Sequence, residues 1–347
     1  MALAKVMVAL SGGVDSSAAA ALLLEQGYDV CGGTLILHKC GEADAVKAKS
    51  VCDKLGIKHY VFDERELFAE KVIKHFAESY DYGFTPNPCI ECNKHLKFGR
   101  LLEHALSLGC DYIATGHYSS ITKINGRYAV CRPQDRKKDQ TYVLWQLSQK
   151  QLSHILMPLC NYTKDEVRGI AERYGFVSAH AKESQDICFV PDNDYAAFLQ
   201  EYNTKPFIKG EYVDIDGKIL GAHSGHQCYT VGQRKGLGIA LGKPQFVISK
   251  DAATNRVVLG DEALLFKTKV YIKDINLMAA DSLDEPLSCT AKCRYSAKDD
   301  ECVVYKTGEN EAVIEFKNAQ RAPSPGQSAV FYNGDTVLGG GIILKGE

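Results

Sequence analysis

Short apolar runs alternate with helix-forming stretches over the first part of the chain. The apolar runs cover residues 6–10, 30–37 and 58–62, and the helical stretches cover 18–24, 42–55 and 66–79. Strands and helices that alternate with short connections are typical of a parallel sheet flanked by helices. We therefore predict an α/β domain at the amino-terminal end, with ligands binding at the carboxyl ends of its strands.

The pattern changes beyond about Thr204 to short alternating runs that glycine and Asp-Gly turns separate. From Lys267 onward such runs recur at regular spacing, and Asn333-Gly334 has the sequence of a tight hairpin turn. This predicts a small, mostly β central domain followed by a C-terminal β-barrel. The expected domains are residues 1–203, 204–266 and 267–347.

The most specific chemistry lies between the first apolar run and the helix that follows it. The string reads Ser11-Gly12-Gly13-Val14-Asp15-Ser16-Ser17. Its glycines let a phosphate approach bare backbone, and its hydroxyls and the helix amino terminus would bind that phosphate. The lysine of a Walker A loop is absent. A carboxylate beside a phosphate needs an intervening cation, so Asp15 predicts bound Mg²⁺. An ordinary strand-to-helix turn would explain one polar residue but not the whole string.

Composition adds limits on location and partners. The 41 basic and 43 acidic residues give a net charge of −2, so an RNA-binding surface would have to be a local patch. No secretory signal or apolar run of membrane-spanning length is evident, which predicts a cytoplasmic protein without a membrane partner. Most of the 13 cysteines are then expected to be buried free thiols, although Cys40 and Cys131 stay undecided.

Two cysteines differ from the others in their expected surroundings. The two prolines of 85–94 predict a rigid extended loop that holds Cys92, with a helix beginning at His95. Cys188 precedes Pro191 in a second polar loop. Thiols in such loops are more reactive than core thiols. Two such thiols beside an activated group suit sulfur transfer, in which one carries a persulfide and the other attacks it to leave a disulfide.

The Ser-Gly-Gly-x-Asp-Ser signature at Ser11–Ser16 resembles the PP-loop family, whose members cleave ATP between the α and β phosphates and form adenylated intermediates. An ordered set of further motifs resembles the tRNA-specific 2-thiouridylases over essentially the whole chain. These motifs are Asn87-Pro88 with Cys92-Asn93-Lys94, Ala114 to Tyr118, Lys138-Asp139-Gln140, Gln185 to Phe189, Gly232 to Leu237, Arg294-Tyr295 and Ala319 to Leu338.

The resemblance implies a tRNA-uridine 2-sulfurtransferase that adenylates O2 of the wobble uridine in tRNAs of the Lys, Glu and Gln types. It implies that Cys188 carries the persulfide, that Cys92 is the partner nucleophile, and that the two close a disulfide. An upstream donor such as a cysteine desulfurase or sulfur carrier would supply the sulfur. The remaining implied site residues fall into three groups. ATP would contact Ala9, Leu10, Ser11, Gly12, Gly13, Val14, Asp15, Ser16, Leu35 and Gly116; the target base would contact Asn87, Pro88 and Cys89; tRNA would contact His117, Lys138, Asp139, Gln140, Arg294, Tyr295 and Gln327.

Cys89 departs from the family pattern, which usually has Asp at this position. Cys89, Cys92 and Cys188 would together provide three thiolates for an iron–sulfur cluster with one iron open to sulfide. Persulfide relay and cluster chemistry therefore both stay open. Two other hypotheses about function also stay open. The protein could be another adenylating PP-loop enzyme, similar to lysidine synthetase or argininosuccinate synthase, or a non-catalytic RNA-binding or iron–sulfur protein on the same fold.

Overall fold

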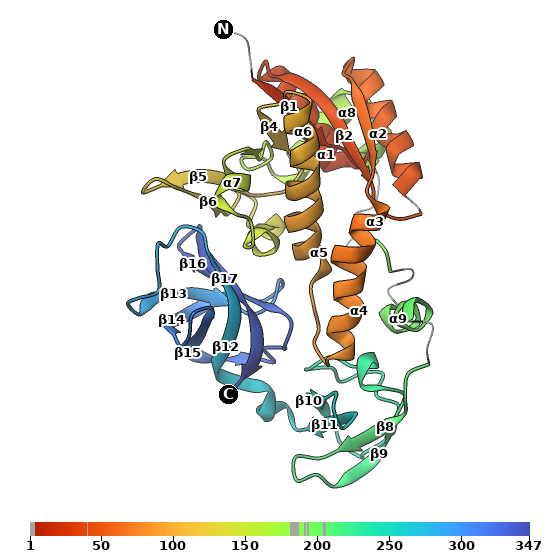
Figure 1. Ribbon diagram of the computed structural model, residues 1–347, viewed down its shortest axis with the longest axis vertical. Coiled ribbons are helices and arrows are strands. Elements are labelled where there is room, and N and C mark those ends of the chain that lie inside the picture. The colour runs from red at the N-terminus through yellow and green to blue at the C-terminus, as the bar shows by residue number, and fades with distance from the viewer. Residues whose placement is uncertain (1–3, 40, 181–186, 191, 193, 204–205) are drawn as a thin grey trace. The chain divides into compact units, whose positions relative to one another are not determined.

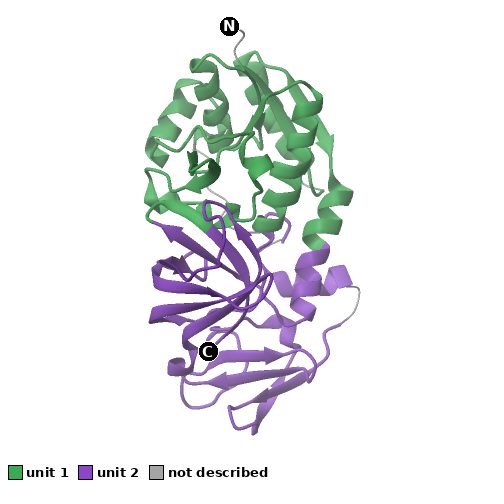
Figure 2. Cartoon of the chain, turned by 60° about the vertical axis from the view of Figure 1, so that its left-hand side comes forward, with its two compact units in different colours: residues 1–73, 89–185, 334–338 green, residues 74–88, 186–333, 339–347 purple. Residues whose placement is uncertain are grey.

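The computed structural model describes residues 4–39, 41–180, 187–190, 192, 194–203 and 206–347. The chain divides into two compact units (Figure 2). The first comprises 1–73, 89–185 and 334–338, and the second comprises 74–88, 186–333 and 339–347. Within the described residues, no helix has the length and apolar character needed to cross a membrane.

The first unit contains a five-stranded, wholly parallel sheet in the order β3–β2–β1–β4–β7 (Figure 1). Its strands are β1 (Lys5–Ala9), β2 (Asp29–Ile36), β3 (His59–Asp63), β4 (Tyr112–Ala114) and β7 (Ile155–Leu156). The predicted parallel α/β domain is confirmed. β1 occupies the centre of the sheet, so the loop that leaves its carboxyl end lies where ligands of such sheets usually bind.

Helices and one hairpin complete this unit. The helices are α1 (Val14–Glu25), α2 (Gly41–Leu55), α3 (Arg65–Phe68), η1 (Ala69–Ile73), α5 (Pro88–Glu91), η2 (Cys92–Arg100), α6 (Leu101–Ser107), η3 (Arg136–Lys138), η4 (Thr141–Leu144), α7 (Gln149–Leu152), α8 (Lys164–Arg173) and η5 (Val177–His180), and the hairpin is β5 (Ser120–Ile124) with β6 (Arg127–Cys131). α1 is buried around most of its circumference because its alanines let α8 approach closely, with Val167 and Ile170 of α8 in the same core. Helix α1, which continues from the Ser11–Ser17 loop, is thus held in place by the core of this unit.

The prediction of an extended loop over 85–94 is wrong for its second half. Helix α5 begins at Pro88 and continues through η2 into α6. Proline is favourable in the first turn of a helix, where its missing N–H would have no partner in any case. The two prolines therefore mark the helix start, and Cys92 lies on a helix instead of in a loop.

The segment η2 has π-helical hydrogen bonding because a side chain binds its backbone. The Gln151 side-chain amide donates to the carbonyl oxygens of Lys94 and Phe98, at 2.9 Å each. A side chain that inserts into the helical ladder in this way widens the turn locally. The widened turns follow immediately after Cys92.

The second unit holds helices α4 (Lys74–Asp81) and α9 (Tyr195–Asn203), a four-stranded sheet and a barrel. The sheet has the order β10–β11–β8–β9, and in the barrel β12 pairs with both β15 and β17, which closes it. The strands are β8 (Gly210–Val213), β9 (Ile219–His223), β10 (Phe246–Asp251), β11 (Arg256–Gly260), β12 (Phe266–Leu277), β13 (Leu287–Lys292), β14 (Asp300–Lys306), β15 (Glu311–Arg321), β16 (Ser328–Asn333) and β17 (Thr336–Gly346). The predicted mostly β second half and closed barrel are confirmed.

Two expected strands of this unit differ in the structure. The alternating run 227–231 is not a strand: residues 226–228 form a single 3₁₀ turn, η7 (His226–Cys228). The run expected at 291–295 is instead the end of β13, which stops at Lys292. Arg294 then turns inward, and its guanidinium binds backbone carbonyls instead of continuing a strand face.

Candidate active site

The loop from Ser11 to Ser17 is held in shape by its own hydroxyl groups. The Ser17 and Ser16 hydroxyls donate to the Gly13 carbonyl at 2.8 and 3.1 Å, and the Ser11 N–H donates to Ser16 Oγ at 3.4 Å. Gly13 is the N-cap of α1, and no side chain caps it. The first N–H groups of α1 are therefore directed toward an incoming anion, as a phosphate site requires.

Two close approaches require glycine at the loop. Gly12 has φ +73°, and a Cβ there would lie 2.3 Å from Cβ of Lys47. A Cβ at Gly116 would lie 2.7 Å from the Ser16 backbone nitrogen. The structure thus brings Gly116, which follows β4, against the loop that follows β1. These two parts of the expected ATP site lie together.

The remaining expected ATP contacts lie on the strands beside this loop. Ala9 ends β1, and the Leu10 N–H donates to the carbonyl of Gly33 on β2 at 2.9 Å. The Thr34 hydroxyl donates to the Leu10 carbonyl at 2.7 Å. Leu35 follows on β2, near its carboxyl end. The geometry therefore supports this set as one neighbourhood, although their contact with ATP stays a prediction.

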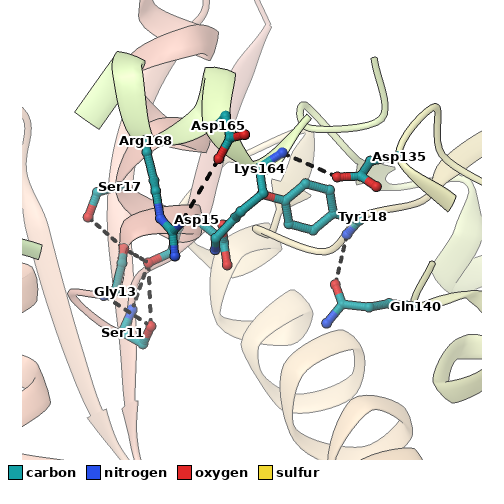
Figure 3. A network of polar contacts seen from close by, with 11 residues as sticks. Ser11, Gly13, Asp15, Ser17, Tyr118, Asp135, Gln140, Lys164, Asp165 and Arg168 are labelled. Carbon is teal, nitrogen blue, oxygen red and sulfur yellow. Dashed lines mark hydrogen bonds and ion pairs between the residues drawn. The ribbon is translucent and has the colours of Figure 1, made fainter. Parts of the chain in front are cut away.

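Asp15 has a cationic partner that sequence reasoning missed. The Lys164 ammonium lies 2.6 Å from Asp15 Oδ1, and the Tyr118 hydroxyl donates to the same oxygen at 2.9 Å (Figure 3). The Lys164 side chain is only 8% exposed, whereas that of Asp15 is 34% exposed. Lysine thus supplies the positive charge beside Asp15, and the carboxylate still reaches solvent where a metal-bound phosphate would arrive.

The sequence around Lys164 contains a signal for the start of a helix. Thr163 and Glu166 form a reciprocal capping box, so the start of α8 is legible in the sequence. A lysine in the first turn of a helix opposes the helix dipole, which favours anions at that end. Figure 3 also shows Arg168, one turn along α8, extending toward the loop. A cation at so unfavourable a place needs a partner, and Asp15 is that partner.

The expected tRNA contacts of the first unit adjoin this network. The Gln140 side chain accepts from the Tyr118 N–H at 2.8 Å, and Asp139 accepts from the Thr141 N–H and hydroxyl. Lys138 ends the short helix η3. The Lys138–Gln140 segment is therefore connected through Tyr118 to the Asp15 carboxylate.

His117 is buried rather than presented to solvent. Its Nδ1 lies 2.8 Å from Thr115 Oγ1, and its ring tilts against Phe98 at 5.7 Å between centroids. Burial holds the pKa of His117 well below its usual range, and the charge of Lys97 acts in the same direction. A neutral imidazole packed in the unit suits positioning of the neighbouring Gly116 turn, and its contact with tRNA stays a prediction.

The cysteines expected to react lie in different settings. Cys89 is exposed in the first turn of α5, and Cys92, one turn later, is 7% exposed. Beside Cys92, the Asn93 amide donates to the Val143 carbonyl at 3.0 Å. Cys188 belongs to the second unit and is exposed, in a turn before Phe189. Gln185 and Asp186 of the same motif lie outside the described residues.

Of the residues expected at the target base, Asn87 and Pro88 directly precede Cys89 in the chain, and Pro88 is buried at the start of α5. Among the described residues, no three His, Cys, Asp or Glu side chains are grouped so as to hold a metal ion. Cys89 and Cys92 belong to the first unit and Cys188 to the second, so a three-cysteine cluster stays a prediction.

Among the expected tRNA contacts of the second unit, Arg294 forms several hydrogen bonds within the protein. Arg294 donates to the carbonyls of Ala322 and Val231, at 2.8 and 2.9 Å, and to the Ser324 hydroxyl at 2.7 Å. Gln327 donates to the Thr85 carbonyl at 2.7 Å, while Tyr295 is 45% exposed. Arg294 thus joins backbone segments of this unit, and Tyr295 is the more accessible of the two neighbours.

Comparison with known proteins assigns the chain to a family. The family described as tRNA methyl transferase HUP domain matches residues 4–192, the tRNA methyl transferase PRC-barrel domain matches 196–261, and the aminomethyltransferase beta-barrel domain matches 267–343. The chain is 48% identical to the tRNA-specific 2-thiouridylase MnmA of Carboxydothermus hydrogenoformans, covering 98% of each chain. It is 49% identical to the MnmA proteins of Clostridioides difficile and Acetivibrio thermocellus, covering 98% of this chain and 98% and 99% of theirs.

The chain belongs to the tRNA-specific 2-thiouridylase family. The resemblance stated from the sequence motifs is confirmed at the level of the family. The relatives match over nearly their whole length, so all three regions of the family are present in this chain.

Proposed function

We propose that this protein is a tRNA-uridine 2-sulfurtransferase that thiolates the wobble uridine of tRNA at the expense of ATP. The observation that carries the proposal is the Ser11–Ser17 loop with its Asp15–Lys164 pair, in a chain 48–49% identical over its length to proteins named tRNA-specific 2-thiouridylases. A carbonyl oxygen is a poor leaving group, and AMP is a good one. Adenylation of the uridine O2 therefore makes replacement by sulfur feasible.

The described residues fit ATP with Mg²⁺. The amino-terminal N–H groups of α1 and the Ser11–Ser17 loop would bind phosphates, and Asp15, with its carboxylate 34% exposed, would hold the Mg²⁺ that neutralises them. Lys164 would orient Asp15, and Arg168, which pairs with Asp165 at 3.9 Å, would add a second cation from α8. Leu35 and Gly116 would border the nucleotide.

For sulfur transfer we propose the persulfide route. The terminal sulfur of a Cys188 persulfide attacks C2 of the adenylated uridine, and AMP leaves. The Cys92 thiolate then attacks Cys188 Sγ, which breaks the S–S bond, leaves the outer sulfur on the base and forms a Cys92–Cys188 disulfide. An external thiol reduces that disulfide, and an upstream persulfide donor reloads Cys188.

The tRNA would reach the site with its wobble base unstacked. Base extrusion costs a few kcal/mol and is easiest in a loop such as the anticodon loop. Asn87, Pro88 and Cys89 would contact the base, and His117, Lys138, Asp139, Gln140, Arg294, Tyr295 and Gln327 would support the tRNA. We place the reaction in the cytoplasm, where the tRNA substrate is found, and the domain limits 1–203, 204–266 and 267–347 stay part of this proposal.

The decisive experiment combines purified protein, an unmodified tRNA transcript, ATP-Mg²⁺ and a persulfide donor. We expect 2-thiouridine in the nucleoside digest and tRNA-dependent release of pyrophosphate. Cys92→Ser with Cys188→Ser should abolish 2-thiouridine but leave ATP binding intact. Retained turnover in that double variant would favour another adenylating PP-loop enzyme, and absence of tRNA-dependent pyrophosphate would favour a non-catalytic RNA-binding protein.

The cluster alternative rests on Cys89, which is exposed one helical turn from Cys92. Anaerobic purification followed by iron and acid-labile sulfide analysis, in wild type and Cys89→Asp, tests it. We expect no stoichiometric iron and unimpaired thiolation in Cys89→Asp. Iron and sulfide that disappear in Cys89→Asp together with activity would replace the persulfide route by a cluster.

A further inference from the structure

A loop of the second unit, Gly232–Leu237, presents two adjacent cations on a fixed backbone. Arg234 and Lys235 are exposed, and within the part of the chain that the structure describes neither forms an ion pair with a carboxylate. Two other cations of this unit are paired with carboxylates, Lys243 with Asp261 and Arg256 with Glu211. The dibasic tip is thus an uncompensated charge in a protein of net charge −2.

The loop is fixed at both ends. At its start, the Gln233 side chain accepts from the Thr230 N–H and donates to the Lys235 carbonyl, at 3.0 Å each, while its backbone pairs with Val247 of β10. At its end, Leu237 is buried, and its carbonyl accepts from the Tyr212 hydroxyl at 2.7 Å. Gly236, with φ +75°, provides the turn between them. Such a loop loses little conformational freedom when it binds.

The same loop borders a hollow of about 450 Å³. Gln233, Arg234, Lys235 and Arg321 line it, with Phe246 and Glu262. Arg321 lies over the Phe246 ring at 5.6 Å and pairs with Glu262 at 3.1 Å. The hollow therefore has three cations against one carboxylate, on a partly aromatic wall. All these residues belong to the second unit.

We propose that the Gly232–Leu237 loop and this hollow bind the phosphate backbone of the tRNA substrate. The inference rests on the proposed function. Arg234 and Lys235 would contact phosphates directly, and Arg321 would add charge from β15. The contact gives affinity and register without base recognition, because phosphate contacts carry no sequence information. It supplies the local basic patch that a tRNA-binding protein of net charge −2 requires.

The test compares Arg234→Ala/Lys235→Ala with wild type for binding of an unmodified tRNA transcript over a series of salt concentrations. Loss of two phosphate contacts should weaken binding about 10-fold at 0.15 M salt and reduce the slope of log K against log salt by about 1–2. The KM for tRNA should rise while kcat at saturating tRNA and the Kd for ATP stay unchanged. Arg234→Lys, which keeps the charge, should bind nearly as wild type does.

The matched control is Lys209→Ala/Lys218→Ala, which removes two exposed lysines from the β8 and β9 region of the same unit. This control should retain wild-type binding and salt slope. If the loop variant and the control behave alike while wild-type protein binds and thiolates tRNA, the inference fails and the proposed function stands. If wild type neither binds nor thiolates tRNA, the proposed function itself fails.

Discussion

Lys164 is a buried cation whose carboxylate partner is accessible at the phosphate loop. In Lys164→Met we expect tRNA-dependent pyrophosphate release to fall by about 10²–10³-fold, because a preorganised charge at the reacting phosphates is lost. Stability should change by only about 1 kcal/mol, since Asp15 can hydrate once its partner is removed. Pyrophosphate release and a denaturant titration measure the two effects.

The control for this prediction is Lys150→Met, which removes an exposed lysine of α7 in the same unit. It should leave pyrophosphate release unchanged. Pyrophosphate release at the wild-type rate in Lys164→Met would show that the Asp15–Lys164 pair serves the fold alone.

The pH dependence of stability provides a second prediction for a single residue, Lys250. Its ammonium donates to the Tyr229 carbonyl at 2.7 Å and lies over the Tyr80 ring, and burial lowers the pKa of Lys250 from 10.5 to about 7. Between pH 7 and 10.5 the unfolded chain binds the proton that the folded chain has lost, so stability rises with pH in this window. The free energy of unfolding of Lys250→Met should therefore exceed that of wild type by the largest amount near pH 6, where wild type buries a charged ammonium.

From pH 6 to pH 9 that advantage should shrink by about 2 kcal/mol, as measured by denaturant unfolding at each pH. Lys209→Met, at an exposed position, should show no such pH dependence. A constant difference between Lys250→Met and wild type across this range would contradict the lowered pKa.

The sequence predicts the phosphate loop well and its cationic partner poorly. The Ser11–Ser17 string is local, so hydroxyls, glycines and helix start can all be identified from adjacent residues. Lys164 lies 149 positions after Asp15, and only the tertiary packing of α8 on α1 brings the two together. The capping box around Lys164 can be identified in the sequence. A lysine in the first turn of a helix, however, indicates a functional site only once its carboxylate partner is known.

At the scale of elements, one glutamine sustains the π-helical turns that follow Cys92. Gln151→Ala removes two hydrogen bonds to the Lys94 and Phe98 carbonyls, each 2.9 Å long. We expect a loss of about 1–3 kcal/mol in the free energy of unfolding, because these carbonyls lose their partners. Hydrogen exchange over 92–100 should also accelerate, and it can be followed by mass spectrometry.

Lys150→Ala, next to Gln151 but exposed, is the matched control and should leave both quantities unchanged. Unaltered hydrogen exchange in Gln151→Ala would mean that the π-helical turns are intrinsic to the 92–100 sequence. The sequence could not indicate this feature because the glutamine lies 57 positions after Lys94 and 53 after Phe98. Similarly, the two prolines of 85–94 predict an interruption of helical structure, whereas Pro88 occupies a first turn in which proline is favourable.

At the scale of the whole molecule, alternation of strand and helix was sufficient to predict the parallel sheet, and regular short runs were sufficient to predict the barrel. The order of the residues along the chain was less informative about which segments group into the same compact unit. Residues 74–88 group with the second unit and 334–338 with the first, because strand pairing and helix continuity cross the linear order. Such interleaving depends on long-range contacts, which local patterns do not encode.

The proposed relay makes a prediction that involves both units, since Cys92 belongs to the first and Cys188 to the second. After a single turnover of persulfide-loaded protein with tRNA and ATP, without reductant, we expect a Cys92–Cys188 disulfide in the non-reduced peptide map. The disulfide should be absent when tRNA or ATP is omitted, because its formation follows sulfur release to the activated base. Cys131→Ser, which alters a thiol on β6 outside the relay, should leave the disulfide in place. Thiolated tRNA with both cysteines still reduced would contradict the relay, because the sulfur would then have left Cys188 without attack by Cys92.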